Sequence, residues 1–214
     1  MIRKLTLILS LVLGMALTST ALAQTPAADP TDALNELDTD VAVYGRTYEG
    51  DLSAQPEEGE ERVLTAIVQA YELDDADVAK EALPHVEQLM KNELEPIVGV
   101  PFETEEVDDM GDTASLSTAE LEESGQSISV SLLLVQQDNV IFLSAAVVMG
   151  GDAETTANDF MEFMLDAEAG DSADTELAED GTSTGGYFDT FPTDEDTDVV
   201  GDLQVTEDMY ETTN

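Results

Sequence analysis

The sequence predicts an α+β domain with an antiparallel β-meander sheet, two helices packed on one face of that sheet, and a disordered acidic tail. Three features predict this architecture. Residues 127–149 have the pattern of a β-hairpin, two other segments repeat apolar residues at helical intervals, and the composition becomes acidic and polar after residue 169. We therefore expect a single folded domain at residues 38–169.

The first 37 residues are expected to lie outside this domain. Residues 1–23 have the three parts of a secretory signal peptide, namely two bases, an apolar run over residues 5–17, and small residues at Ala21 and Ala23. An uncleaved membrane anchor is the alternative, although the apolar run is short for a membrane span. Residues 24–37 are rich in Ala, Pro, Thr and Asp, and this composition predicts a spacer.

Two strands are predicted before the first helix. Residues 41–48 alternate so that Tyr44 and Tyr48 share a face. Residues 62–73, RVLTAIVQAYEL, have apolar residues at spacings that fit a helix and also fit a strand. We interpret this segment as a strand.

The first helix is predicted over residues 77–95, where apolar residues recur at helical intervals after a potential cap in the aspartate pair at 74–75. Pro84 lies inside the pattern, and it is expected to kink the helix or start a second one because it removes a backbone hydrogen bond. Pro96 and Gly99 are expected to end the helix.

The remaining strands are predicted to form a meander. Residues 102–107 and 113–121 are expected to be short strands joined by a turn. In residues 127–149 we expect a hairpin whose tight turn has Asp138 and Asn139 at its centre. The register then pairs Gln137 with Val140, Leu134 with Leu143 and Val130 with Val147.

The two faces of this hairpin differ in composition. One face is apolar apart from Gln136, and the opposite face mixes serines, including Ser127, Ser129 and Ser131, with apolar residues. This difference predicts a sheet that is packed on one side and partly covered on the other. The apolar face is therefore the expected core.

A last helix is predicted after Asp152, which is a potential N-cap, and a tail is predicted after the helix. Residues 170–214 contain 14 acids, no base and scattered apolar residues. Such a composition buries too little surface to offset the cost of ordering the chain, so we expect disorder. Tyr187, Phe188 and Phe191 are the exception, because they could dock the tail onto the domain.

Three segments within the predicted domain, YELDDADVAKEAL, VDDMGD and LLLVQQDNVIFLSAAV, resemble a pattern found in exported, acidic α+β proteins of bacteria whose role is uncharacterised. The resemblance extends over residues 62–168. It implies a fold and an extracytoplasmic location, and it transfers no catalytic residue.

Charge limits the partners of this chain. If the signal peptide is removed, four bases remain against 49 acids: Arg46, Arg62, Lys80 and Lys91. Such a surface repels nucleic acid and anionic membranes, and it suits a saline exterior, cations or a basic protein partner. The absence of cysteine excludes disulfides, so stability must come from a core.

Few residues point to catalysis. His85 is the single histidine, with Glu81 one helical turn before it, so catalytic triads and acid/base schemes that need two histidines are excluded. The serines lack a nucleophile-elbow pattern, and no phosphate-binding or dinucleotide-binding glycine motif is present. We nominate no catalytic residue. A hydrolase that uses a carboxylate pair stays an alternative, but 49 acids allow no pair to be chosen by spacing.

Calcium is the cofactor that best suits an acidic chain, because it needs oxygen ligands alone. Asp108, Asp109 and Asp112 surround Gly111 at a predicted strand-to-strand turn and form a candidate metal site. A plain polar turn is the alternative reading of these three residues. A second candidate lies at residues 194–198, where aspartates alternate as in a calcium-binding loop but the required glycine and closing glutamate are missing.

These observations together predict a secreted, non-enzymatic domain with a binding or envelope-surface role. Its ligand, partner and assembly state are not encoded in any motif. A calcium-binding exported protein and an extracellular hydrolase are the alternatives.

Overall fold

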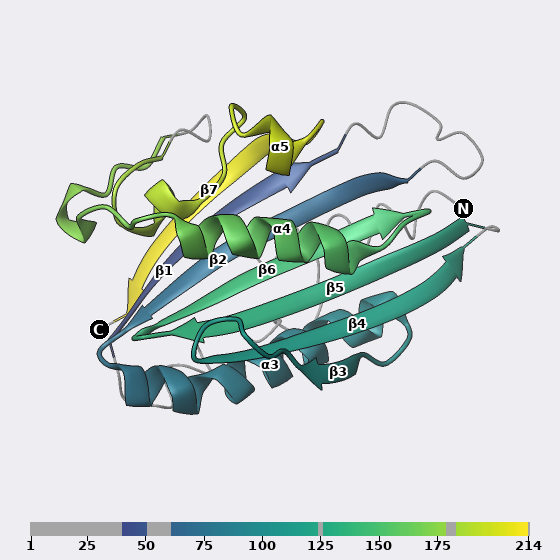
Figure 1. The fold of residues 1–214 in the computed structure, drawn as a ribbon, viewed down its shortest axis with the longest axis horizontal. Coiled ribbons are helices and arrows are strands. Elements are labelled where there is room, and N and C mark those ends of the chain that lie inside the picture. The colour runs from purple at the N-terminus through teal and green to yellow at the C-terminus, as the bar shows by residue number, and fades with distance from the viewer. Residues whose placement is uncertain (1–39, 51–60, 124–125, 179–182, 214) are drawn as a thin grey trace, which may run out of the picture.

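The computed structural model describes residues 40–50, 61–123, 126–178 and 183–213. The fold is α+β, as predicted, and is built on one open antiparallel sheet of seven strands in the order β3-β4-β5-β6-β2-β1-β7 (Figure 1). The strands are β1 (Val41–Glu49), β2 (Arg62–Leu73), β3 (Glu103–Glu106), β4 (Thr113–Glu123), β5 (Gln126–Gln137), β6 (Val140–Met149) and β7 (Gln204–Thr213). The predicted signal peptide and spacer lie outside the described residues.

The predicted hairpin is β5 and β6, and its register is confirmed. Leu134 pairs with Leu143 and Val130 with Val147. The tight turn needs a residue with positive φ, and Asp138 adopts a φ of 52°. Asp and Asn tolerate this conformation better than most residues because their side chains are short and polar. Strand β6 is the fourth of the seven strands, so the hairpin forms the centre of the sheet.

The chain crosses the sheet twice, once on each face, and each time through a helix. Strands β1 and β2 pair first, helix α3 (Ala76–Val98) then leads to β3 at the far edge, and the meander β3-β4-β5-β6 comes back to pair with β2. Helix α4 (Ala153–Asp166) crosses the other face, and the C-terminal strand β7 pairs with β1.

The caps of the two long helices match the sequence prediction. The side chain of Asp75 accepts a hydrogen bond from the backbone N–H of Val78, and Gly99 ends α3 in the left-handed conformation. Asp152 caps α4 through the N–H of Glu154. Helix α3 continues through both Pro84 and Pro96, so the prediction that Pro96 ends the helix is wrong. Both prolines are exposed, so water can satisfy the carbonyls that the missing N–H groups leave unpaired.

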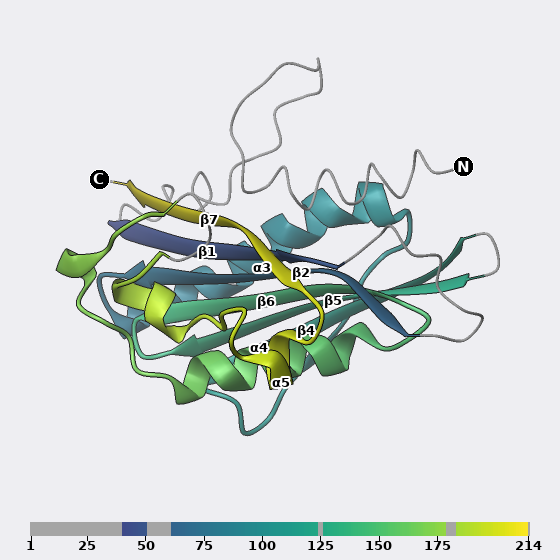
Figure 2. The ribbon, with the colours of Figure 1, turned by 90° about the horizontal axis from the view of Figure 1, so that it is seen from above.

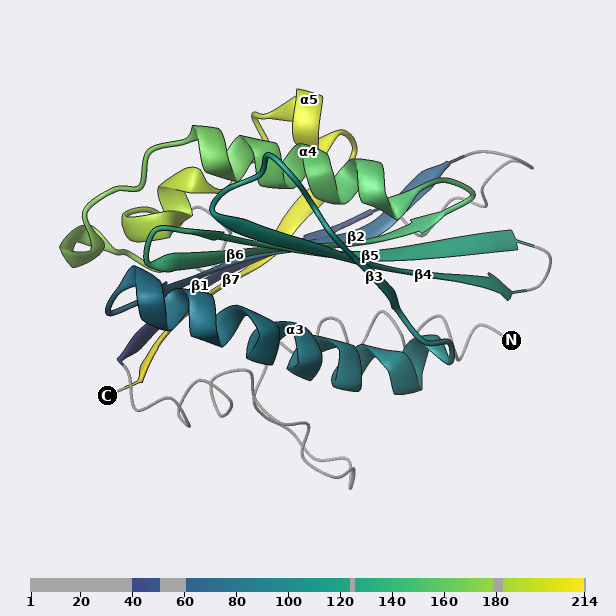
Figure 3. The same ribbon diagram turned by 60° about the horizontal axis from the view of Figure 1, so that its bottom comes forward.

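The prediction that both helices pack on one face is wrong, because α3 and α4 lie on opposite faces (Figure 3). Figure 2 shows the sheet between them in a second view. Helix α3 covers the face that carries Leu132 and Leu143, whereas α4 covers the face that carries Leu133 and Phe142. The sheet therefore has a core on each side.

Serines on the second face had suggested that it was partly open. They are buried instead, because small side chains let α4 approach the sheet closely. Ser131 and Ser144 are at most 1% exposed, and the Oγ of Ser129 accepts a hydrogen bond from the N–H of Ala153 at the start of α4. The serines thus lie on the surface against which α4 packs.

The prediction of a disordered tail is also wrong for residues 170–178 and 183–213, which are placed against the rest of the domain. They contain two 3-10 turns, η2 (Ser172–Asp174) and η3 (Gly186–Thr190), the short helix α5 (Thr197–Val200), and strand β7. Backbone pairing with β1 holds one edge of β7, and a few buried residues anchor the remainder. The average composition of residues 170–214 did not predict this ordered segment, because its docking depends on a small number of side chains.

Burial of both faces changes the expected response to charged substitutions in β5. Ser131→Asp should destabilise the domain by several kcal/mol, as much as Leu132→Asp, because either change buries a carboxylate without a base to pair it. Ser127→Asp is the matched control, since Ser127 is exposed on the same face as Ser131. Urea unfolding of the three variants measures this, and a mild effect of Ser131→Asp would show that α4 leaves that face open.

Candidate functional site

The most concentrated polar chemistry in the interior is the ion pair between Arg46 of β1 and Asp208 of β7. These residues are direct cross-strand partners. The Nε of Arg46 donates to Asp208 Oδ1 at 2.7 Å, and Nη2 donates to Oδ2 at 3.0 Å, so the contact is bidentate. The two side chains are 1% and 0% exposed.

Arg46 also binds the segment that precedes α5. Its Nη1 donates to the carbonyls of Phe191 and Pro192 at 3.4 and 3.3 Å, and Nη2 donates to the carbonyl of Ser183 at 3.1 Å. The backbone N–H of Ser183 donates in turn to Asp208 Oδ2. These bonds use all five N–H donors of the guanidinium, so Arg46 has a structural role and none of its donors is left for a ligand.

Aromatic rings complete this anchor on the α4 face. Tyr44 contacts Tyr187, Phe188 and Tyr210, with ring centroids 5.5, 5.5 and 4.9 Å apart. The guanidinium of Arg46 lies 5.8 Å from the ring centroid of Phe188. Docking of the C-terminal segment through its aromatic residues, which the sequence left open, is thus observed. The pairs of Tyr44 with Tyr187 and Phe188 have the favourable edge-to-face geometry, and the pair with Tyr210 is tilted.

Burial shifts the pKa of the groups in this anchor. Desolvation alone would lower the pKa of Arg46, but its hydrogen bond and charge interaction with Asp208 outweigh this effect, so the pKa is raised. Desolvation raises the pKa of Tyr48, whose hydroxyl donates to the carbonyl of Pro192 at 2.6 Å. Burial, with the nearby carboxylates of Glu72 and Asp138, raises the pKa of Tyr187 to about 12.

The candidate metal residues Asp108, Asp109 and Asp112 lie in the turn between β3 and β4. Asp109 adopts a positive φ of 65°. The carboxylate of Asp112 accepts hydrogen bonds from the backbone N–H of Asp138 at 3.0 Å and from Nε2 of Gln136 at 3.4 Å, so it braces the central hairpin turn. Across the described ranges, no three acidic, histidine or cysteine side chains are grouped to hold a metal. Calcium binding at this turn stays a prediction.

The second calcium candidate is occupied by internal hydrogen bonds. Asp194 Oδ1 accepts from the N–H of Val205, and Asp196 Oδ2 accepts from both the N–H and the hydroxyl of Thr193. These contacts shape the turn that leads into α5 and β7.

His85 and Glu81 both lie exposed on α3, where solvent surrounds them.

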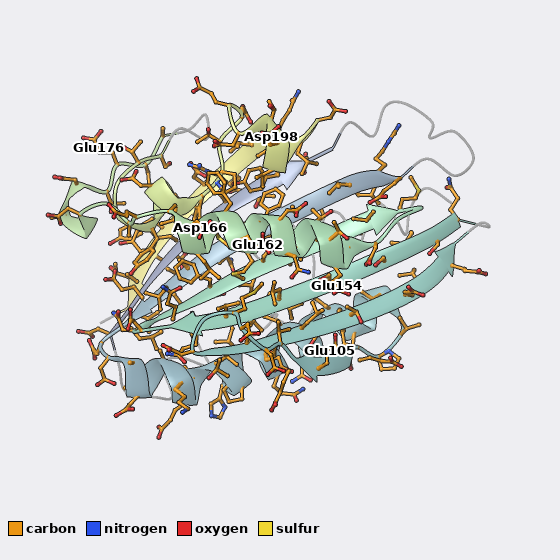
Figure 4. All side chains as sticks on the ribbon, in the orientation of Figure 1. Glu105, Glu154, Glu162, Asp166, Glu176 and Asp198 are labelled. Atoms are coloured by element: carbon orange, nitrogen blue, oxygen red, sulfur yellow. The ribbon has the colours of Figure 1, made fainter. Side chains whose placement is uncertain are left out.

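The exposed surface is dominated by carboxylates. Arg46 is buried, and Lys91 is held by Glu87 at 2.9 Å on α3. Figure 4 shows acidic side chains distributed over β3, α4, the C-terminal segment and α5; those labelled are Glu105, Glu154, Glu162, Asp166, Glu176 and Asp198. Negative charge therefore extends over several elements with few bases to balance it.

A small apolar slot lies on the α3 face, beside the edge strand β7. Its free volume is about 30 Å³, and its lining includes Gly45, Ile67, Met90, Leu94, Glu207 and Met209. Met209 packs over Gly45, where a Cβ would meet the methionine Cε at 3.2 Å. The slot could take the tip of one apolar side chain.

Comparison with known proteins adds no assignment. No protein-family model matches the chain. No curated protein matches it either.

Within the described ranges, no helix combines the length and the apolar character needed to cross a membrane.

Sequence reasoning missed the Arg46–Asp208 anchor. The available signal was a lone arginine between Tyr44 and Tyr48, in a segment (residues 41–48) with no other charge, because such a charge needs an acidic partner if it is buried. Its partner lies 162 residues further along the chain, among many other acids. Sequence spacing could not select Asp208 from them.

Removal of one member of the buried pair should be costly. Arg46→Met leaves the Asp208 carboxylate buried without a cation, and we expect a loss of about 3–5 kcal/mol in the free energy of unfolding. Lys91→Met, at a more exposed pair, should cost about 0–1 kcal/mol. Urea unfolding compares the two variants. The double variant Arg46→Met/Asp208→Leu should recover part of the loss, and a fully additive loss would contradict the pairing.

Mild acid should stabilise the domain. Desolvation raises the pKa of Glu72 above its ordinary value of 4.5, and desolvation followed by the charge of Asp208 does the same for Glu207. The folded state therefore binds these protons more tightly than the unfolded state. Their contribution to stability is fully present below pH 4.5 and is lost as the pH rises through the folded pKa values.

The measurement is urea unfolding between pH 7 and pH 4.5. We expect the free energy of unfolding to rise as the pH falls, and Glu72→Gln/Glu207→Gln should flatten this slope. Glu105→Gln/Glu162→Gln, at exposed positions, is the matched control and should keep the slope. Equal slopes in the two double variants would contradict the assignment to Glu72 and Glu207.

Proposed function

We propose that this chain is an exported, non-enzymatic binding domain with an envelope-surface or extracellular role, adapted to saline surroundings and able to bind cationic partners. The observation that carries the proposal is the imbalance of charge. One of the four bases beyond the signal-like segment is buried, and another is held by a glutamate, whereas carboxylates lie over β3, α4, α5 and the C-terminal segment.

The shape of the molecule supports a binding role. Both faces of the sheet are covered by helices, and the most polar interior contact, around Arg46, is fully used by the protein itself. The groups left on the surface to contact a partner are therefore mainly carboxylates. Such a surface attracts cations and basic proteins from a distance, and salt screens that attraction.

Location at the exterior rests on the signal-like segment at residues 1–23. An acidic surface of this density also repels anionic membranes and nucleic acid. A basic protein partner is the occupant that fits both the charge and the location.

The test is capture of secreted proteins from the native host on the immobilised mature chain. Basic proteins should be retained at 0.1 M sodium chloride and released by about 1 M, as the Debye length falls from about 10 Å to about 3 Å. A variant with amides in place of the six carboxylates labelled in Figure 4 should retain less. Retention that is insensitive both to salt and to this variant would overturn the proposal.

A further inference from the structure

Strand β7 (Gln204–Thr213) is the last strand of the sheet, and one of its edges has no strand partner in the described part of the chain. Its other edge pairs with β1 along the whole strand. An edge of this kind presents backbone N–H and C=O groups that can pair with an added strand.

The two edges of the sheet differ in how they are protected. Strand β3 is four residues long, and its residues, including Glu103, Glu105 and Glu106, are all exposed, so it is a short and charged edge. Strand β7 is ten residues long. Its N–H at Val205 is capped by Asp194, but no described side chain caps the backbone from Glu207 onward.

The α3 face of β7 has an alternating pattern of charge. Glu207, Met209 and Glu211 share this face, because their partners in β1 are Thr47, Gly45 and Val43. Glu211 is exposed, and Glu207 is half-buried. Neither carboxylate has an ion-pair partner among the described residues, and desolvation together with Asp208 raises the pKa of Glu207. A nearby cation would relieve this cost.

An apolar contact lies between the two carboxylates. Met209 is half-buried over Gly45, at the rim of the slot that Ile67, Met90 and Leu94 line. Methionine side chains adapt readily to a neighbouring apolar group. The face thus offers acid, apolar and acid positions at the two-residue spacing of a strand.

We propose that the outer edge of β7, from Glu207 to Thr213, accepts an extended segment of a basic partner protein as an eighth strand. The segment has two bases four residues apart that lie beside Glu207 and Glu211, and an apolar residue midway between them that packs on Met209. This inference rests on the proposed function, because it names the surface by which the domain binds a cationic partner.

Charge selects this occupant over a second copy of the chain. An antiparallel pairing of two β7 strands brings Glu207 and Glu211 of both copies together, and like charges on neighbouring strands destabilise the pair. A strand with Lys, an apolar residue and Lys at every second position instead places an ammonium group beside each carboxylate. Main-chain hydrogen bonds then supply affinity, and the alternation supplies specificity.

The probe is the peptide Thr-Lys-Thr-Val-Thr-Lys-Thr, titrated into the isotope-labelled mature chain and followed by NMR. Shift changes should concentrate at residues 207–213. Two further peptides carry N-methyl groups, one at the Lys and Val amides and the other at the inner Thr amides. Because one edge of the added strand pairs with β7, methylation of that edge alone should weaken binding about tenfold.

Matched variants separate the edge from general charge attraction. Glu207→Gln/Glu211→Gln should weaken peptide binding about tenfold, whereas Glu103→Gln/Glu105→Gln, with the same change in net charge on the opposite edge, should leave it unchanged. A folded spectrum of each variant controls for stability.

The inference would be overturned if the two methylated peptides had equal effects or if the two double variants had equal effects. Self-association in place of peptide binding would overturn it as well. If the peptide fails to bind while salt-dependent capture of basic proteins succeeds, the β7 edge is the wrong surface and the proposed function stands. If neither occurs, the proposed function fails as well.

Discussion

The buried ion pair between Arg46 and Asp208 is the interaction on which the C-terminal segment of the domain, residues 183–213, depends. A charge in a covered sheet is costly unless it is paired and its remaining hydrogen-bonding groups are satisfied. Here the guanidinium meets one carboxylate and three backbone carbonyls. The pair therefore fixes β7 against β1 and the 183–192 segment above both strands. Tyr44, Phe188 and Phe191 then exclude water from it.

This anchor explains how an extremely acidic chain keeps a folded C-terminal segment. Most of its carboxylates oppose compaction by mutual repulsion, which salt screens. Asp208 is different because its charge is neutralised inside the fold, and several other aspartates accept backbone hydrogen bonds at turns and helix starts. Asp75, Asp112, Asp152 and Asp194 have this role. Some of the acidic residues thus stabilise turns and helix starts, and the remainder are solvated on the surface.

The sequence predicted what depends on neighbouring residues. The hairpin register followed from a tight turn at Asp138 and from alternation, and the helix caps followed from Asp75 and Asp152. What it missed depends on distant pairs. The serines at 129 and 131 were interpreted as part of a partly covered face because nothing local shows that α4 returns to cover them. Disorder was predicted after residue 169 from composition, because nothing local shows that Asp208 pairs with Arg46, 162 residues earlier in the chain. The candidate metal residues illustrate a third limit, since Asp112 braces a turn through hydrogen bonds that spacing does not reveal.

The central claim is that β7 and the segment before it belong to one cooperative domain anchored at Arg46. Native-state amide hydrogen exchange at the residues that pair β1 with β7 tests it most directly. The account predicts that the amides of β7 that bond to β1 open with the same free energy as those that join β1 to β2. Exchange of the β7 amides at a much lower opening free energy, while the β1–β2 pairing stays protected, would contradict it.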